Sequence, residues 1–310
     1  MCFNSKILSL NKTYIVAVSG GPDSLFSLDN LRQSRYKIIV AHVNYHKRVE
    51  SDREEILVKN YCQNYSLSCE VYSVQSSEYN LVSNFQALAR KIRYNFFQIL
   101  ARKYQTKYII IAHHFDDCLE TYLLQKQRRS LVDYWGISPK TKYQKYWVLR
   151  PFLSFTKSQI IHYLNQKKIS YSTDSTNQLP ICQRNIIRQK LNSLGLTEKN
   201  NLAQEIKAKN QQLKKTKSLV KKEKKRLIKQ NNVLELNLQP QLAPEIYLRL
   251  IYEWVNSITN GLLQQSKKRR LNEIYKQLFE SPKKKAVVNL GSKWQIIKSD
   301  GQASLKIIKN

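Results

Sequence analysis

The sequence predicts an α/β fold, with a doubly wound, mainly parallel sheet followed by a smaller C-terminal α+β domain. From residue 13 to about residue 194, short runs of β-branched residues alternate with helix-length segments, which is typical of βαβ units. A stretch dominated by lysine follows. The chain then closes with two helical patterns and two short apolar runs, so a second, smaller fold is expected there.

Four apolar runs in the first part are expected to form buried strands. Unbroken apolar runs of this length are typical of parallel strands that helices cover on both faces. The runs cover residues 14–18, 37–41, 70–74 and 108–112.

The clearest helix between these runs is expected over residues 85–103. Arg90 and Arg93 lie away from its apolar stripe, three residues apart and therefore on neighbouring turns. The stripe consists of Phe85, Leu88, Ala89, Ile92, Phe96, Ile99 and Leu100.

The composition changes after Leu194. Residues 198–229 contain twelve basic and three acidic residues with few apolar positions, which fits either a solvated charged helix or an arm that contacts RNA. We expect a first domain over 1–195, a basic helical linker over 196–232 and a small domain over 233–310.

The small domain opens with helical stripes over 247–258 and 271–279. Apolar runs at 293–297 and 304–308 follow, and Asp300-Gly301 between them is a turn signal for a β-hairpin. The helical stripes are expected to form core and not a ligand site.

The net charge of the chain is strongly positive, because 53 Lys and Arg residues stand against 22 Asp and Glu residues, giving +31. This excess is larger than solubility requires and indicates a polyanionic partner, with nucleic acid as the first candidate. An AT-biased genome, which raises the content of Lys and Asn in general, is a second source of the charge.

The sequence contains no sign of membrane insertion or of a metal-binding cysteine pattern. No apolar run reaches about eighteen residues and no signal region follows the first residues, so we expect a cytoplasmic protein without a membrane span. The cysteines are odd in number and form no C-x-x-C pair, so free thiols are expected. They are Cys2, Cys62, Cys69, Cys118 and Cys182.

The sharpest local feature is Ser19-Gly20-Gly21-Pro22-Asp23-Ser24, directly after the first expected strand and before a helical pattern. Paired glycines let backbone N–H groups approach an anion, serine hydroxyls can donate, and the next helix offers its positive N-terminus. The segment is not a Walker loop, because no lysine follows the glycines. We expect it to bind phosphate; an ordinary glycine-rich turn is the alternative.

A second polar cluster, His113-His114-Phe115-Asp116-Asp117-Cys118-Leu119-Glu120-Thr121, also follows a strand and opens a helix. A helix puts Asp117 and Glu120 on one face, where paired carboxylates could bind an ammonium group, a magnesium ion or a proton from a nucleophile. A zinc site is less favoured, because the C-x-x-C and H-E-x-x-H patterns are both missing.

Both clusters resemble motifs of the PP-loop ATPases, and of the tRNA(Ile)-lysidine synthases in particular. The first is similar to the S-G-G-x-D-S pyrophosphate loop, and the second to the H-H-x-D-D-x-x-E-T motif of the lysidine synthases. Gln86 and Arg129 depart from the family pattern, which has Glu and Gly there. Further matches follow in the family's order: Ala41-His42-Val43-Asn44, Ala89-Arg90-Lys91-Ile92-Arg93-Tyr94, Arg150-Pro151-Phe152-Leu153, Asp174-Ser175-Thr176-Asn177 and Arg184-Asn185-Ile186-Ile187-Arg188.

The resemblance implies a PP-loop fold of the adenine nucleotide alpha hydrolase type and a ligase reaction. ATP adenylates the first anticodon cytidine of isoleucine tRNA with a CAU anticodon, and free L-lysine then displaces AMP to give lysidine. The implied cofactors are ATP and magnesium, with Asp23 as the magnesium ligand, and a homodimer is left open.

The resemblance also implies roles for individual residues. Asp23, Arg93, Asp117 and Glu120 are the implied catalytic residues. Contacts to ATP are implied for Ser19, Gly20, Gly21, Pro22, Asp23, Ser24, His42 and His113, and contacts to substrate or tRNA for Arg90, Arg150, Asp174, Asn177, Arg184 and Arg188. For the basic positions, surface charge or a structural ion pair is the alternative.

Two other functions stay open. A thiolase of the PP-loop class activates the same kind of carbonyl but delivers sulfur, and such enzymes usually need paired cysteines; Cys62 and Cys69 are seven residues apart. A non-catalytic RNA-binding protein on the same fold explains the charge, but not Asp23, Asp117 and Glu120 together.

Overall fold

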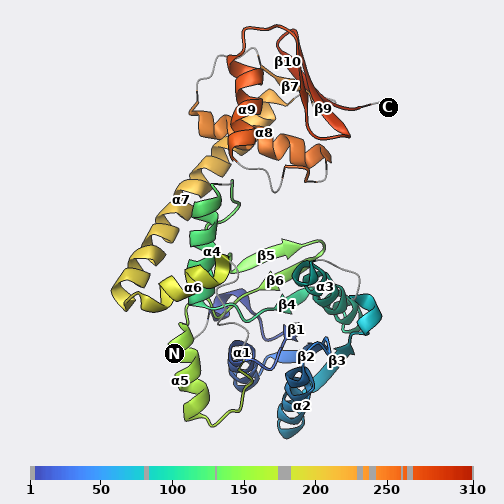
Figure 1. Cartoon of the computed structure of the whole chain (residues 1–310), viewed down its shortest axis with the longest axis vertical. Coiled ribbons are helices and arrows are strands. Elements are labelled where there is room, and N and C mark those ends of the chain that lie inside the picture. Colours follow the sequence, from blue (N-terminus) through green and yellow to red (C-terminus); the bar gives the residue numbers. More distant parts are fainter. Residues whose placement is uncertain are drawn as a thin grey trace. The chain divides into compact units, whose positions relative to one another are not determined.

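The computed structural model divides the chain into two compact units (Figure 1). The first unit comprises Met1–Thr121 and Gly136–Leu194, and the second comprises Tyr122–Trp135 and Gly195–Asn310. The residues described are 4–79, 84–129, 131–173, 183–228, 233–236, 242–259, 261–263 and 268–308.

The first unit is built on a six-stranded sheet with the order β3-β2-β1-β4-β6-β5. Neighbouring strands are parallel except for the β5–β6 hairpin, so the expected mainly parallel sheet is confirmed. The strand expected over 70–74 forms over 68–73, but the expectation that it is buried is wrong, because β3 lies at the sheet edge and its side chains are only partly covered. The strands are β1 (Thr13–Ala17), β2 (Lys37–Asn44), β3 (Ser68–Ser73), β4 (Tyr108–Ile110), β5 (Lys140–Tyr143) and β6 (Tyr146–Leu149).

Helices cover both faces of this sheet (Figure 1). Side chains of β1 alternate between two cores: Tyr14 and Val16 pack with α1, α2 and α5, whereas Ile15 packs with α3. The helices of this unit are α1 (Pro22–Gln33), α2 (Val49–Asn64), α3 (Phe85–Lys103), α5 (Lys157–Gln166), α6 (Gln183–Ser193) and the first half of α4 (Phe115–Arg128), with short 3-10 turns η1 (Ser5–Ile7) and η2 (Ser76–Glu78).

Helix α3 has the bounds that the sequence predicts, but its buried face differs in part. Ala89, Ile92 and Phe96 of the expected stripe are buried, whereas Ile99 is 52% exposed. Phe97, outside the stripe, is buried against the sheet. The buried face of a helix is broader than one row of residues, and the sheet decides where that face ends.

The order of the strands creates a switch point between β1 and β4. The chain moves outward from β1 to β2 and β3, then returns to β4 on the other side of β1, where Val16 pairs with Ile110. The loops after β1 and β4 therefore leave neighbouring strand ends in opposite directions. Ligands of open α/β sheets bind at such points, and both polar clusters follow these two strands.

Within its described residues, the second unit combines α7, α8, α9 and the second half of α4 with a four-stranded antiparallel sheet of order β7-β10-β9-β8. The expected hairpin joins β9 to β10, with Asp300 and Gly301 at φ 49° and 76° in its turn. The helices are α7 (Leu196–Leu227), α8 (Pro244–Thr259) and α9 (Lys268–Tyr275), the last continued by a π-helical turn, η5 (Lys276–Glu280). The strands are β7 (Leu234–Glu235), β8 (Ala286–Asn289), β9 (Trp294–Ser299) and β10 (Gln302–Ile307).

Helix α7 belongs to the second unit, and so do residues 122–135, which differs from the boundaries expected from the sequence. Val220 and Leu227 of α7 join the same core as Trp254 of α8. The Asn210 side chain accepts a hydrogen bond from the Trp135 N–H (2.9 Å) and donates one to its carbonyl (3.0 Å). These contacts fasten the segment after α4 to α7.

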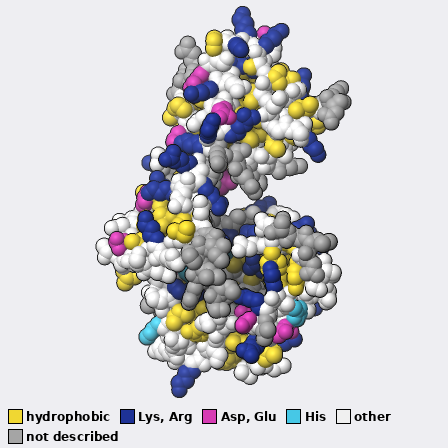
Figure 2. Space-filling model, in the orientation of Figure 1, with side chains coloured by type: hydrophobic (Ala, Val, Ile, Leu, Met, Phe, Trp, Pro, Cys, Tyr) yellow, Lys and Arg dark blue, Asp and Glu magenta, His cyan; other side chains and the backbone are white. Residues whose placement is uncertain are grey.

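Lys and Arg side chains gather along the solvent side of α7 (Figure 2). The exposed lysines of this helix include Lys207, Lys214, Lys215, Lys221, Lys222 and Lys225. None of the helices in the described ranges combines the length and apolar character that crossing a membrane requires.

Candidate functional site

The Ser19–Ser24 loop is held in shape mainly by its own backbone and by Ser24. Gly21 is the N-cap of α1, so the free N–H groups of the first helical turn begin inside the loop. The Ser24 hydroxyl donates to the Gly21 carbonyl (2.8 Å) and accepts from the Ser19 N–H (3.2 Å). Ser24 is buried and braces the loop, whereas Ser19 is exposed and its hydroxyl accepts a hydrogen bond from the Gly21 N–H (3.4 Å).

Gly20 is required by the conformation of this loop. Its φ of +88° lies in the left-handed region, and a Cβ there would lie 3.2 Å from the Cβ of Glu54. The Gly20 carbonyl also accepts a hydrogen bond from the Ser172 N–H (3.0 Å), and the Ser172 hydroxyl donates to Glu54 (3.0 Å). The loop therefore has Glu54 and Ser172 as close neighbours on one side.

His42 lies behind the loop. Its side chain is buried, and burial lowers its pKa, so the ring is neutral near pH 7. The Nδ1–H group donates to the carbonyl of Val18 (2.9 Å), and Val18 is the last residue before the loop. This geometry suits a residue that positions the loop backbone from beneath.

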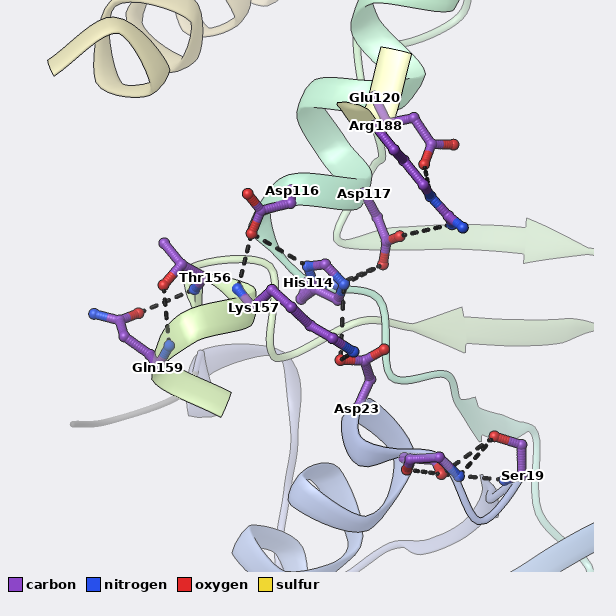
Figure 3. Close-up of polar contacts among 12 residues, drawn as sticks. Ser19, Asp23, His114, Asp116, Asp117, Glu120, Thr156, Lys157, Gln159 and Arg188 are labelled. Carbon is purple, nitrogen blue, oxygen red and sulfur yellow. Dashed lines mark hydrogen bonds and ion pairs between the residues drawn. The ribbon is translucent and has the colours of Figure 1, made fainter. Parts of the chain in front are cut away.

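His114 joins the loop to the second polar cluster (Figure 3). Its Nε2 lies 3.7 Å from Asp23 Oδ1 and 3.4 Å from Asp117 Oδ2, and its Nδ1 lies 3.6 Å from Asp116 Oδ2. Burial acts to lower the pKa of His114, but Asp116, Asp117 and Asp23 outweigh it and raise that pKa. The motif led us to expect an ATP contact at His113 and assigned no role to His114, although both histidines stand in it.

His113 has the opposite electrostatic environment. Burial, together with the nearby Arg150, Arg90 and His114, lowers its pKa to about 4, against the opposing charge of Asp117. Its Nδ1 accepts a hydrogen bond from the Arg150 Nε–H (3.1 Å). His113 is therefore neutral at pH 7.

Arg150 lies inside the first unit. It is 8% exposed, and its Nη1 donates to the Ser138 carbonyl (2.8 Å) and to Thr141 Oγ1 (2.9 Å). Its guanidinium thus orients His113 and anchors the β5 segment. This burial argues against a direct contact between Arg150 and tRNA.

Glu120 and Asp117 meet two arginines from α6. Glu120 is only 2% exposed; its Oε2 accepts from the Arg188 Nε–H (2.6 Å), and its Oε1 pairs with Arg184. The Arg188 Nη2 also lies 4.0 Å from Asp117 Oδ1. Residues more than sixty positions apart in the chain therefore form one charged cluster, and Arg184 and Arg188 make ion pairs, the alternative that the sequence left open for them.

Arg90 and Arg93 are exposed on α3. Arg90 lies over the Tyr94 ring at 4.7 Å and donates to its hydroxyl (3.2 Å). Burial raises the pKa of Tyr45 to about 12, against the opposing charge of Arg93. Because Tyr45 directly follows β2, Arg93 lies near the carboxyl end of that strand. Asp174 and Asn177, the remaining expected contacts, lie outside the described residues.

Lys157 is a site residue that the sequence motifs do not predict. It opens α5, and its Nζ donates to Asp23 Oδ1 at 2.6 Å (Figure 3). The Thr156-x-x-Gln159 capping box, which begins three residues after the R-P-x-L element ends, marks the start of this helix in the sequence. That signal predicts a helix start, but it does not reveal that the start faces the loop.

Comparison with known proteins agrees with this site. Residues 3–194 match the family model of the PP-loop domain. A tRNA(Ile)-lysidine synthase of Mycoplasma mycoides subsp. mycoides is 38% identical over 294 residues, covering 91% of this chain and 71% of that protein. One from Mesoplasma florum is 33% identical over 297 residues, covering 94% and 73%. The chain belongs to the tRNA(Ile)-lysidine synthase family.

The PP-loop fold is also found in a solved U34-tRNA thiolase of Methanococcus maripaludis. The two share a TM-score of 0.50 and 14% identity, over 66% of this chain and 74% of that one. At this identity the likeness concerns the fold alone.

The cysteines of this lysidine synthase family member do not favour the thiolase alternative. Cys62, Cys69 and Cys118 are free thiols, and Cys2 and Cys182 lie outside the described residues. Cys62 lies on the buried face of α2, and Cys69 is the second residue of β3. The amino end of a parallel strand lies at the opposite edge of the sheet from the phosphate loop.

Proposed function

We propose that this chain ligates L-lysine to the first anticodon cytidine of isoleucine tRNA with a CAU anticodon. The reaction consumes ATP and yields pyrophosphate, AMP and lysidine. One observation carries the proposal: His114 lies within 3.7 Å of both Asp23 of the phosphate loop and Asp117 of the carboxylate cluster. The groups suited to activating a base and those suited to receiving an amine thus share one edge of the sheet.

In the first step, the carbonyl oxygen of cytosine attacks the α-phosphorus of ATP, and the bond to pyrophosphate breaks. The loop N–H groups and the N-terminus of α1 stabilise the negative charge of the phosphates. Arg93, near the carboxyl end of β2, stabilises charge on the adenylated base.

Magnesium is compatible with the residues present. No group of three or more His, Cys, Asp or Glu ligands occurs in the described part of the chain. Magnesium in ATP-using sites, however, needs only one or two carboxylates, because phosphates and water complete its shell. Asp23 would be that carboxylate, and the ion would neutralise charge on the leaving pyrophosphate.

In the second step, the ε-amine of lysine attacks the activated ring carbon, and AMP leaves. The amine must be neutral to attack, although an unperturbed lysine has a pKa of about 10.4. Asp117 accepts the proton, and the buried Glu120, whose two oxygens pair with Arg184 and Arg188, holds those arginines beside Asp117. The guanidinium groups of Arg184 and Arg188 offset the negative charge of the carboxylates. The ammonium group of the substrate lysine is therefore stabilised less and releases its proton more readily.

The exposed lysines of α7 bind the phosphate backbone of the tRNA. The target base leaves its stack at low cost, because an anticodon loop is single-stranded. The exposed lysines of α7 and the net charge of +31 support a backbone contact, which weakens steeply as salt is raised.

The decisive test is incorporation of radiolabelled lysine into unmodified isoleucine tRNA bearing a CAU anticodon, with ATP and magnesium. Wild type should label the tRNA, Asp23→Asn should not, and Asp300→Asn, in an exposed hairpin turn, is the matched control. ATP cleavage on tRNA without lysine incorporation would point to another nucleophile, as in a thiolase. Binding of tRNA without any ATP cleavage would support a non-catalytic RNA-binding protein.

A second test addresses the grip on tRNA. Lys214→Gln with Lys222→Gln should lower tRNA affinity and reduce the slope of log affinity against log salt by about 0.9 for each phosphate that is no longer neutralised. Lys37→Gln with Lys107→Gln removes two exposed lysines at the amino ends of strands and is the matched control. Equal losses of affinity in both double variants would contradict a specific role of α7.

A further inference from the structure

Lys157 faces the phosphate loop from a separate helix, 134 positions away from Asp23 in the chain. Three contacts fix the start of α5 (Figure 3). The Thr156 hydroxyl accepts from the Gln159 N–H (3.3 Å), Gln159 Oε1 accepts from the Thr156 N–H (3.0 Å), and the Lys157 N–H donates to Asp116 Oδ2 (2.8 Å). The Lys157 side chain is 42% exposed beyond this anchored backbone, so its ammonium can move.

Helix α5 is held in register against α1. The Phe26 ring of α1 packs edge-on against Phe155 and Tyr163, with ring centroids 5.0 and 5.1 Å away. The buried Asp29 of α1 accepts a hydrogen bond from the Tyr163 hydroxyl (2.6 Å). The two helices therefore begin side by side, one with Asp23 in its first turn and the other with Lys157.

Asp23 cannot serve Lys157 and a magnesium ion equally. Its Oδ1 already lies 2.6 Å from the Lys157 Nζ and 3.7 Å from His114 Nε2. A magnesium ion bound by Asp23 would repel the ammonium at that distance. The displaced ammonium would then pair with the strongest anion beside it, which is the phosphate chain that arrives with the metal.

We propose that Lys157, with the first turn of α5, forms the second wall of the phosphate site and binds the β- and γ-phosphates of ATP. In this arrangement Lys157 pairs with Asp23 before the nucleotide binds, and it pairs with the phosphates instead of Asp23 once ATP is bound. After the bond between the α- and β-phosphates breaks, Lys157 remains paired with the pyrophosphate product. The N-terminus of α5 adds its partial positive charge to that of α1. This inference rests on the proposed use of ATP.

The test measures binding rather than turnover, by titration calorimetry of the full chain with inorganic pyrophosphate and magnesium, and separately with AMP. Lys157→Ala should weaken pyrophosphate binding by about ten- to a hundredfold, because a charged hydrogen bond is removed, and should change AMP binding by less than about twofold. Lys157→Arg should recover most of the affinity. Lys167→Ala, at the exposed far end of α5, is the matched control.

A structural role for Lys157 makes a different prediction. If Lys157 only stabilises α5 through Asp23, Lys157→Ala lowers the melting temperature while pyrophosphate affinity stays at the wild-type value, and the proposal is overturned. Wild type that binds ATP but not pyrophosphate also overturns it. If the wild type binds neither ATP nor pyrophosphate, both the proposed use of ATP and the proposed role of Lys157 are contradicted.

Discussion

The phosphate loop and the carboxylate–arginine cluster lie at the same edge of the sheet but are built in opposite ways. Six consecutive residues form the loop, and backbone groups do most of its work. The cluster consists of side chains: Asp117 and Glu120 from α4, with Arg184 and Arg188 from α6. The two regions should therefore respond differently to substitution: the loop to a change of backbone conformation, the cluster to a change of charge at fixed shape.

The largest effect is expected for Asp117→Asn, which removes a charge and preserves shape. Lysine transfer should fall by about 10²- to 10⁴-fold because the proton acceptor is missing, while tRNA-dependent exchange of pyrophosphate into ATP stays near the wild-type rate. The asparagine oxygen can still accept from the His114 N–H, as Asp117 Oδ2 does at 3.0 Å. Equal loss of both activities would show that the two regions do not act separately.

Gly20→Ala tests whether the phosphate loop depends on its backbone conformation. The KM for ATP should rise by about tenfold or more, because alanine at φ +88° is strained and its Cβ would lie 3.2 Å from Glu54. The KM for lysine should not change. Gly291→Ala is a matched control for strain, since Gly291 has φ +90° and open space around it. A normal KM for ATP in Gly20→Ala would contradict the importance of the loop geometry.

Arg188→Gln tests the effect of removing one positive charge from the carboxylate–arginine cluster. The KM for lysine should fall by a few-fold, because the carboxylates attract the ammonium more strongly, and kcat should fall by about tenfold, because the amine keeps its proton longer. Arg184→Gln should do less, since that side chain is 56% exposed against 41% for Arg188. A rise in the KM for lysine would mean that Arg188 binds the substrate itself.

The smallest effect concerns pH and His113, which accepts a hydrogen bond from Arg150 next to the residue that joins the two regions, His114. Its pKa of about 4 is below the ordinary 6.5, so between pH 6.5 and 4 the unfolded chain binds a proton that the folded chain does not. Stability therefore falls as the pH drops through this window. Between pH 7 and 5 the wild type should lose about 2 kcal/mol more than His113→Asn in urea unfolding. Parallel losses would contradict a half-buried, neutral His113.

The residues of the loop could be identified from sequence because their chemistry is local. Glycines, serines and a helix start in six consecutive positions describe a phosphate site whatever surrounds it. The same holds for Asp117 and Glu120, which the helical period alone puts on one face. The bounds of α3 and the hairpin turn at Asp300-Gly301 are equally local.

Other features of the site depend on contacts between distant segments. Arg150 reads as an RNA contact in the sequence, but it is buried beside His113 because β5 and β6 fold back at the sheet edge. Lys157 carries no motif of its own and gains its place only because α5 packs against α1. No spacing rule within one segment could predict either contact.

The sequence by itself determined the mainly parallel sheet, the phosphate loop and the family of this protein, because hydrophobic period, glycine conformation and motif order are written in consecutive residues. The tertiary structure alone decided that His114 joins Asp23 to Asp117, and that the segment after α4 belongs with α7. The physical reason is that the strand order and the helix packing set which side chains meet, and both arise from burial across the whole chain.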